Sequence, residues 1–242
     1  VCEIYTDVDG VFSADPRIVP AARKLDRITY EEMLDMAASG AKVLMPRCVE
    51  YARRFNVPVH VRSSFSGLEG TWVVGETEEG DEMEDPIIAG VAHDKSEAKI
   101  TVTGVPDVPG SAARLFEAVA RADVNIDMIV QNVSRDGKTT DMTFTVGKTD
   151  LERTVADLES KKGELGYTEM ITDSNVVKVS VIGVGMRSHA GIAKTMFSAL
   201  SEKGINIQVI STSEIKVSVL ISEEYTELAL RALHEAYGLD AE

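Results

Sequence analysis

The feature that most constrains this sequence is an internal repeat in its second half. The segment KITVTGVPDVPGSAARLFEAVARADVNIDMIVQNVS is matched further along by KVSVIGVGMRSHAGIAKTMFSALSEKGINIQVISTS. Gly110 and Asn125 both recur 81 positions later, as Gly191 and Asn206. Such a repeat dominates the prediction of the fold, because each copy is expected to form the same unit.

Each copy is predicted to form a strand, a glycine-containing loop, an amphipathic helix and a second strand. The first copy continues with a strand at Thr140–Val146, a helix at Asp150–Lys161 and a strand near Tyr167–Thr172. This βαββαβ order is the ferredoxin-like arrangement. The second copy ends after a helix at Glu223–Tyr237, so it lacks one strand. The strand-like segment Ile87–His93 precedes the first copy, and we predict that it completes the second module, with the first module inserted in the second.

Strands also alternate with helices before the repeat, which is typical of α/β packing. We predict strands at Val1–Thr6 and Val57–Arg62 and helices in TYEEMLDMAASGAKVL, where Gly40 marks an end or a pause, and at Pro46–Phe55. The acidic run GETEEGDEMEDP predicts a linker. The predicted domains are residues 1–66, a linker at 67–85, a first module at 97–174, and a second module at 86–96 and 175–242.

The composition excludes several classes of protein. A net charge of -15 disfavours binding to phosphate backbones, and an aromatic content of 5% offers no platform for stacking bases. Two cysteines cannot form the disulfide framework of a small secreted domain, and no apolar run approaches the roughly 20 residues that span a bilayer. The start, VCEIYTDVDG, has neither the pattern of a signal peptide nor an initiator Met. We therefore expect a cytoplasmic segment of a longer chain, with no nucleic-acid or membrane partner.

The repeated loops are the first candidate site. Each opens a helix, and free N–H groups at a helix N-terminus bind carboxylates. The first copy offers Asp107, Gly110, Ser111, Ala112, Asn125, Asp127 and Gln131, and the second offers Met186–Gly191, Asn206, Ser211, Thr212 and Ser213. Singly, each residue is typical of turn chemistry. Their joint recurrence favours a pair of sites for small amino acids, in which Asp107 would meet an α-ammonium group.

The loop Thr6–Arg17 is the second candidate site. An EF-hand needs Gly at loop position six and Glu at twelve, whereas counting from Asp7 places Gly at four and Ile18 at twelve, which excludes calcium. Clustered acids and an arginine after a strand suit a nucleotide with its magnesium, although neither a Walker A motif nor a Rossmann fingerprint occurs. On spacing alone, an ordinary solvated loop remains the alternative. No partner stands at metal spacing from His189 and no His lies near Cys48, so we predict no metal site and no catalytic residue.

Longer motifs carry a resemblance to one family. The run IYTDVDGVFSADPRIVPAARKLDRITYEEMLDMAASGAKVL closely resembles the end of the catalytic domain of aspartate kinases, and EYARRFNVPVHVRSSFSGLEGTWV resembles their run into the regulatory region. DKSEAKITVTGVPDVPG, VNIDMIVQNVS, GMRSHAG and NIQVISTSEIKVSVLI resemble the two ACT domains of that enzyme, in its actinobacterial form. The resemblance covers essentially the whole chain. It implies an α/β fold in which the C-terminal edge of an amino-acid-kinase domain precedes two ferredoxin-like ACT domains, the first inserted in the second.

The resemblance also implies an activity and its regulation. The complete enzyme would phosphorylate the side-chain carboxylate of L-aspartate with ATP and Mg2+, in lysine and threonine biosynthesis, and no cofactor would be tightly bound to this chain. The positions that match ATP contacts are Thr6, Asp7, Phe12, Arg17, Lys42 and Val43. The positions that match contacts of feedback effectors are Asp107, Gly110, Ala112, Asn125, Ile126, Asp127, Gln131, Asn206, Ile207 and Ser213.

In such relatives, threonine and lysine bind between the ACT domains of paired chains, which implies a homodimer. Ala190 and Ala193 stand where relatives often have Pro and Thr. This departure bears on the response to lysine as an effector. The family's glycine-rich strand with its Lys, its aspartate-binding residues and its Gly-Arg-Gly-Gly motif would precede Val1. The chain alone is therefore expected to be inactive without the remainder of the kinase domain or a catalytic subunit. The alternative is a non-catalytic regulatory subunit or a stand-alone amino-acid sensor, which residues 1–66 disfavour.

Overall fold

The computed structural model describes residues 1–75, 87–121, 123–134, 137–189 and 191–240. The chain forms two compact units. The first combines Val1–Asp94, Lys178–Gln208 and Thr212–Glu242, and the second combines Lys95–Val177 and Val209–Ser211. Within the described ranges, no helix is long and apolar enough to cross a membrane.

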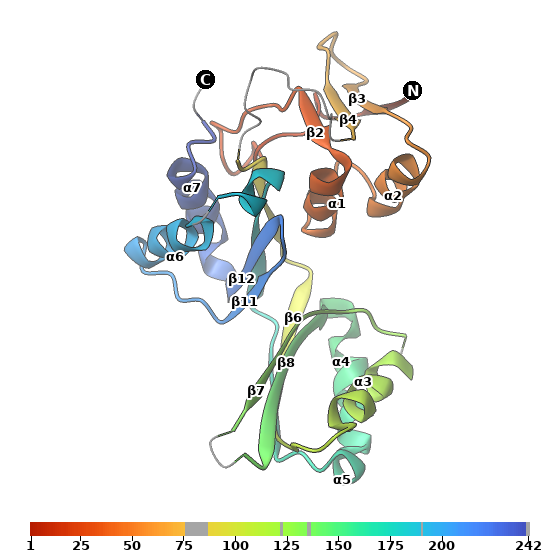
Figure 1. The fold of residues 1–242 in the computed structure, drawn as a ribbon, viewed down its shortest axis with the longest axis vertical. Coiled ribbons are helices and arrows are strands. Elements are labelled where there is room, and N and C mark those ends of the chain that lie inside the picture. Colours follow the sequence, from red (N-terminus) through yellow and green to blue (C-terminus); the bar gives the residue numbers. More distant parts are fainter. Residues whose placement is uncertain (76–86, 122, 135–136, 190, 241–242) are drawn as a thin grey trace. The chain divides into compact units, whose positions relative to one another are not determined.

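The N-terminal region is a four-stranded sheet with the strand order β1-β3-β4-β2. β1 (Cys2–Thr6) is parallel to β3 (Val59–Ser63), β3 is antiparallel to β4 (Thr71–Val74), and β4 is parallel to β2 (Arg27–Thr29). The helices α1 (Tyr30–Ala38) and α2 (Pro46–Arg54) lie beside one another next to this sheet (Figure 1). Helices and strands share one apolar core, which includes Met33, Met36, Val49, Val61 and Val73.

Helix α1 begins at a capping box. The Oγ1 atom of Thr29 accepts the N–H of Glu32 at 3.2 Å, and the Glu32 carboxylate accepts the N–H of Thr29 at 3.1 Å. Glu31 and Glu32 also place negative charge in the first turn, where the helix dipole favours it. The helix ends at Ala38, close to Gly40, whose φ of +104° is unfavourable for other residues. The predicted end near Gly40 is confirmed.

The C-terminal sheet has the strand order β11-β12-β10-β5. Its strands are β5 (Gly90–Asp94), β10 (Val176–Ile182), β11 (Val209–Thr212) and β12 (Lys216–Ser222). The helices α6 (Ile192–Glu202) and α7 (Thr226–Ala236) lie on one side of β11 and β12 (Figure 1), and two 3-10 turns, η2 (Val184–Arg187) and η3 (Glu223–Tyr225), precede them. β5 pairs antiparallel with β10, with Val91 opposite Val181. The prediction that an upstream strand completes the second module is confirmed.

The sheet of the second unit has the strand order β7-β8-β6-β9. Its strands are β6 (Glu97–Pro106), β7 (Ile126–Val133), β8 (Thr139–Gly147) and β9 (Glu169–Asp173). The helices α3 (Ser111–Arg121) and α4 (Leu151–Ser160) cover one face of it (Figure 1), and η1 (Lys148–Asp150) and α5 (Lys162–Leu165) flank α4. Leu115, Phe144 and Leu158 are fully buried between helices and sheet. The strand order equals that of the C-terminal sheet with β9 in the place of β5. The repeat therefore produces two units of the same layout, but the C-terminal one takes its outer strand from before the first copy of the repeat in the chain.

The predicted linker at residues 67–85 needs a correction at its N-terminal end, where β4 forms. Thr71 in this strand is fully buried. Its Oγ1 atom accepts the N–H of Val11 at 2.9 Å and donates to the carbonyl oxygen of Leu25. The segment TWVV belongs to the N-terminal sheet, because it pairs with β3 and β2. Its Thr71 hydroxyl also satisfies buried polar groups of neighbouring loops. The rest of the acidic run, residues 76–85, lies outside the described residues.

β5 also binds the N-terminal region. The N–H of Val91 donates to the carbonyl oxygen of Ser13 at 2.7 Å, and a Cβ on Gly90 would lie 2.6 Å from the same oxygen. A Cβ on Gly40 would clash with the carbonyl oxygen of His93. Within the first unit, the N-terminal region and the C-terminal module therefore pack backbone against backbone along β5.

A buried histidine makes a second connection of this kind. His234 on α7 is 2% exposed, and its Nε2 atom lies 2.9 Å from the Oγ atom of Ser13. The same Oγ atom accepts the N–H of Arg23 at 2.9 Å, so its hydroxyl proton is free to be donated to a neutral imidazole. Burial lowers the pKa of His234 below its ordinary value; nearby Asp240 raises this pKa and Arg23 lowers it.

We expect Gly40→Ala to lower the free energy of unfolding by more than about 2 kcal/mol, because the new methyl group must displace backbone at a positive φ. Gly204→Ala is the matched control: its φ is +69°, but nothing lies within 4 Å of the new Cβ, so only about 1 kcal/mol should be lost. Urea unfolding of the three proteins measures both values. Equal losses would contradict the close approach of Gly40 to β5.

The pKa of His234 predicts a dependence of stability on pH. Since this pKa is lowered in the folded state, the unfolded state takes up a proton first as the pH falls below about 6.5, and the folded state loses stability. We expect the loss between pH 7.5 and 5.5 to be smaller in His234→Gln, which keeps a hydrogen-bonding group near Ser13 but does not titrate. Urea unfolding at the two pH values checks this. An identical loss in both proteins would refute the assignment.

Candidate functional site

The loop after β1 holds four of the predicted ATP contacts. Thr6 ends the strand, and its Oγ1 atom donates to the Oδ1 atom of Asp7 at 3.1 Å. Asp7 is exposed, whereas Phe12 is half-buried and forms an isolated β-bridge with Lys24. The loop is therefore anchored by its apolar part and presents its carboxylate to solvent.

Arg17, at the end of this loop, forms a bidentate ion pair with Asp15. Its Nη2 atom lies 2.7 Å from Oδ2 of Asp15, and its Nε and backbone N–H both donate to Oδ1 at 3.0 Å. Hydrogen bonds from Arg17 hold the pKa of Asp15 below its ordinary value, and the same pair raises the pKa of Arg17. The Arg17 side chain is nevertheless 88% exposed, so its guanidinium group is fixed in place and still accessible to an anion.

Lys42 and Val43 occupy the turn between α1 and α2. Val43 packs against the core of the N-terminal region. Lys42 is exposed and has no side-chain hydrogen bond or ion pair with any described residue. Lys42 and Arg17 thus supply two accessible positive charges of the N-terminal region, although no described bond joins the turn to the loop of Thr6–Arg17.

In the second unit, the glycine-containing loop opens α3 as predicted. The N–H of Asp107 donates to the carbonyl oxygen of Lys138 at 2.8 Å, and the Asp107 side chain is exposed. Gly110 has a φ of +94°, and nothing lies within 4 Å of a Cβ placed on it. Ser111 begins the helix, and Ala112 packs against the core. The open space at Gly110 is where a ligand backbone could approach.

The predicted side chains in and next to the following strand differ in their exposure. Asn125, Asp127 and Gln131 are exposed, whereas Ile126 packs into the core. A β-bulge between Asp127 and Val130 changes the register, so that Asp127 lies opposite Thr145 and Gln131 opposite Met142. Directly opposed residues share a face of the sheet, and residues 142 and 145 lie on opposite faces. The bulge therefore directs Asp127 and Gln131 to different faces, which the spacing of the sequence does not reveal.

The C-terminal module repeats the loop geometry. Gly191, directly before α6, has a φ of +101° and no atom within 4 Å of an added Cβ, as at Gly110. Asn206 is exposed and Ile207 half-buried before β11, and the N–H of Ser213 donates to the carbonyl oxygen of Lys216 at 2.8 Å. The repeat is therefore one of backbone conformation as well as of sequence. Ala190 lies outside the described residues, and Ala193 is half-buried in α6.

Two acidic residues of α1, Glu32 and Asp35, make contacts that no sequence motif predicts. Glu32 accepts the N–H of Val184, at the start of the second module's glycine-containing loop, at 2.9 Å, and Asp35 pairs with Lys216 at 2.7 Å. The capping box reveals the local use of Glu32, but its partner 152 positions away leaves no signal in the sequence. Across the described ranges, no group of three or more His, Cys, Asp or Glu side chains could hold a metal ion.

Comparison with known families divides the chain in the same way. Residues 1–63 match the amino acid kinase family, and residues 99–163 and 179–237 each match an ACT domain. The aspartokinase of Mycolicibacterium smegmatis is 61% identical over 241 residues, which cover 99% of this chain and 57% of that protein. The chain thus spans little more than half the length of the curated relatives it matches.

Solved structures agree with these matches. The crystal structure of aspartokinase alpha and beta subunits contains a chain that is 50% identical, with a TM-score of 0.59; the match covers 62% of this chain and 99% of that chain. E. coli aspartokinase III with aspartate and ADP (R-state) is 27% identical, with a TM-score of 0.83 over 97% of this chain and 51% of that chain. The same enzyme with lysine and aspartate (T-state) is 26% identical, with a TM-score of 0.75 over 96% and 51%. This chain therefore belongs to the aspartokinase family.

Proposed function

We propose that this chain is the regulatory end of an aspartate kinase, which transfers a phosphoryl group from ATP to the side-chain carboxylate of L-aspartate and forms 4-phospho-L-aspartate. The observation that carries this proposal is the packing of an amino-acid-kinase edge against an ACT domain in one compact unit. A protein that only sensed amino acids would not need this edge. We place the enzyme in the cytoplasm, in the synthesis of lysine and threonine.

Part of the ATP site is assigned to the N-terminal region. The exposed cations Arg17 and Lys42 suit the phosphates of ATP, because positive groups at the phosphates offset the charge that develops during transfer. The other assigned residues are Thr6, Asp7, Phe12 and Val43. Mg2+ would accompany the ATP phosphates. The similarity to an E. coli aspartokinase III structure that contains ADP supports this assignment.

The two ACT domains are assigned to feedback effectors, L-threonine and L-lysine. An amino acid presents a carboxylate, which suits the N–H groups at the starts of α3 and α6, and an ammonium group, which suits Asp107. The open space beside Gly110 and Gly191 allows a ligand to approach the backbone in both domains. The remaining assigned residues are Ala112, Asn125, Ile126, Asp127, Gln131, Asn206, Ile207 and Ser213. The E. coli enzyme has been solved with lysine, which supports an amino-acid effector.

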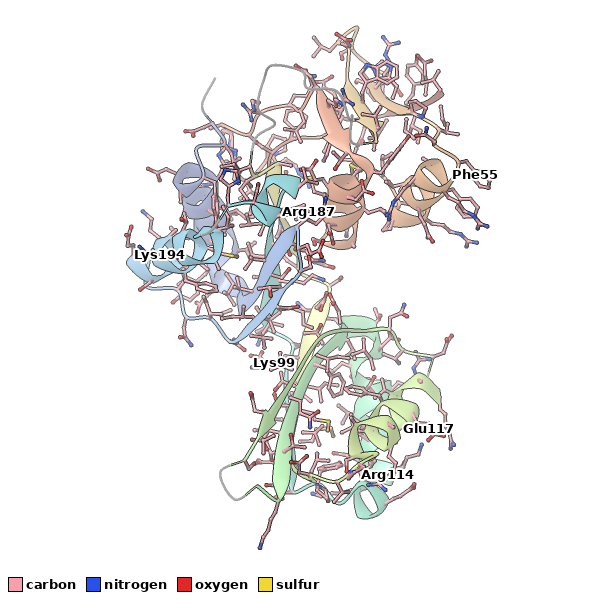
Figure 2. The ribbon with its side chains drawn as sticks, in the orientation of Figure 1. Phe55, Lys99, Arg114, Glu117, Arg187 and Lys194 are labelled. Carbon is pink, nitrogen blue, oxygen red and sulfur yellow. The ribbon has the colours of Figure 1, made fainter. Side chains whose placement is uncertain are left out.

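We further propose that the chain pairs with a second copy through its ACT domains and joins the remainder of a kinase domain. An apolar groove of about 290 Å³ on the N-terminal region supports the contact with the remainder of a kinase domain. Cys2, Ile4, Leu44, Cys48, Tyr51 and Phe55 are among the residues that line it. Phe55, labelled in Figure 2, is 64% exposed just beyond the end of α2. An exposed apolar surface of this kind is typical of an interface, and the longer relatives have further chain to cover it.

The domain boundaries are also part of the proposal. We assign residues 1–66 and β4 to the kinase edge, 97–174 to the first ACT domain, and 86–96 with 175–242 to the second. The matched ranges support this division, and the compact unit that contains Lys95–Val177 supports the separation of the first ACT domain. A free regulatory subunit is the second candidate function, favoured by the solved subunit chain that this chain covers almost completely. The match of residues 1–63 to the amino acid kinase family favours the first.

Titration calorimetry with L-threonine and L-lysine, separately and together, tests the effector assignment. We expect binding heat, and a loss of about tenfold in affinity for one effector in Asn125→Ala, because a hydrogen bond to a charged ligand group is removed. Asn206→Ala tests the second domain in the same way. Asn175→Ala is the matched control, since Asn175 lies in the turn between β9 and β10. A folded dimer that gives no heat with either amino acid would overturn the assignment.

The chain by itself should form no aspartyl phosphate. The amino acid kinase match covers only residues 1–63, and we propose that the remaining catalytic groups lie in the part of the relatives that this chain does not span. Trapping of the acyl phosphate with hydroxylamine measures the product, and the full-length M. smegmatis aspartokinase serves as the active control. ATP-dependent product from this chain alone would show that the proposed division of catalytic parts is wrong.

A further inference from the structure

We infer that Glu32 is a positioning residue that couples the ligand loops of the C-terminal ACT domain to helix α1 of the kinase edge. This inference rests on the proposed function, because it names a route by which effector binding would reach the assigned ATP contacts. All the residues involved lie within the first compact unit.

The Glu32 carboxylate is buried, and both of its oxygen atoms accept hydrogen bonds. Its side chain is part of a residue that is 5% exposed. The Oε1 atom accepts the N–H of Val184 at 2.9 Å, and the Oε2 atom accepts the N–H and the hydroxyl of Thr29 at 3.1 and 2.9 Å. An ionised carboxylate only accepts hydrogen bonds, so it matches a site with three donors and no competing acceptor.

Val184 lies at the base of the first ligand loop. One residue, Gly183, separates it from β10, and it begins the turn η2, from which the chain runs on to Gly191 and α6. Arg187, labelled in Figure 2, ends this turn. The neighbouring Gly183 donates its N–H to the carbonyl oxygen of Ile215 at 2.9 Å, which joins the base of this loop to the turn between β11 and β12. A shift of either loop is therefore expected to move the Val184 N–H.

Asp35 makes the matching contact with that turn. Its Oδ1 atom lies 2.7 Å from the Nζ atom of Lys216, the first residue of β12. The carbonyl oxygen of Lys216 accepts the N–H of Ser213, an assigned effector residue. Residues three apart on a helix share a face, so Glu32 and Asp35 form one acidic face of α1. This face contacts the bases of both ligand loops of the C-terminal domain.

The opposite end of α1 leads to the assigned ATP contacts. After Ser39 caps the helix, the chain passes through Gly40 to Lys42 and Val43. Met33 and Met36 pack α1 into the core, so the helix is expected to move as one body. If effector binding moves the Val184 N–H, the carboxylate must either carry α1 with it or lose a buried hydrogen bond. Both outcomes change the position or the stability of the turn that holds Lys42.

Glu32→Gln separates this bridge from the helix cap. Glutamine also forms capping boxes, and its single side-chain oxygen is needed where Thr29 presents two donors. Its NH2 group would then face the N–H of Val184, where no hydrogen bond can form. Glu31→Gln is the matched control: it removes the same charge from the same helical turn, but Glu31 pairs with Arg53 of α2 at 2.9 Å.

Hydrogen exchange of the 242-residue chain without ligand tests the bridge. We expect the Val184 amide to exchange about tenfold faster, or more, in Glu32→Gln, because a charged acceptor is lost. The rate should be unchanged in Glu31→Gln, and the protection of the first turn of α1 should largely remain in Glu32→Gln. An unchanged rate for Val184 in Glu32→Gln would refute the bridge.

Addition of L-threonine, L-lysine or both tests the coupling. We expect ligand to alter the exchange of α1 and residues 39–43 in the wild type and in Glu31→Gln, and this response to disappear in Glu32→Gln while binding heat persists. A response that survives in Glu32→Gln refutes the coupling and leaves the proposed function intact. Failure of the wild type to bind either ligand refutes the proposed function and the coupling together.

A second pair of variants covers the case in which Glu32→Gln does not fold. Asp35→Asn and Lys216→Met each break the half-exposed ion pair at the other end of the acidic face. Both should reduce the response of α1 to ligand, and the double variant should reduce it no further than either single variant. A full response in all three proteins would overturn the inference.

Discussion

The strand β5 is the constraint on which the rest of the first unit depends. It pairs with β10 and so completes the C-terminal ACT sheet, while its Val91 N–H binds the carbonyl oxygen of Ser13 in the N-terminal region. Buried backbone donors and acceptors must find partners, so neither neighbour can withdraw without leaving such groups unpaired. The first ACT domain lies in the chain between β5 and β10, and it is therefore an insertion whose two ends are held by one pair of strands.

The two ACT domains have the same backbone conformation at their glycine-containing loops, but these loops make different contacts. Gly110 and Gly191 have the same left-handed conformation and the same open surroundings. In the C-terminal domain, however, the bases of the loops bind Glu32 and Asp35 of α1. Duplication thus provides two similar glycine-containing loops, and in the C-terminal domain these contacts join the loop region to the kinase edge.

Burial decides how strongly a polar contact resists disruption, so buried contacts are better suited than exposed ones to couple two parts of the fold. The exposed pair of Arg231 and Glu227 on α7 is screened by water and contributes little. The Glu32 carboxylate is buried with three donors, and the loss of one leaves part of a charge without a partner, which costs more than an exposed pair does. A stiff link of this kind is suited to couple two elements, since it holds only one arrangement.

The sequence by itself determined the two βαββαβ units, the missing strand and its source, because hydrophobic period, turn glycines and the repeat are local signals. It also located both groups of candidate loops, whereas the capping box at Thr29 is seen only in the structure. The tertiary structure decided the membership of β4 in the N-terminal sheet, the opposite faces of Asp127 and Gln131, and the partners of Glu32 and His234. These features depend on sheet register and on contacts between residues far apart in the chain. The hydrogen bond between Val184 and Glu32 joins residues 152 positions apart, so it forms only when packing brings the two atoms together. No local sequence pattern predicts such a contact.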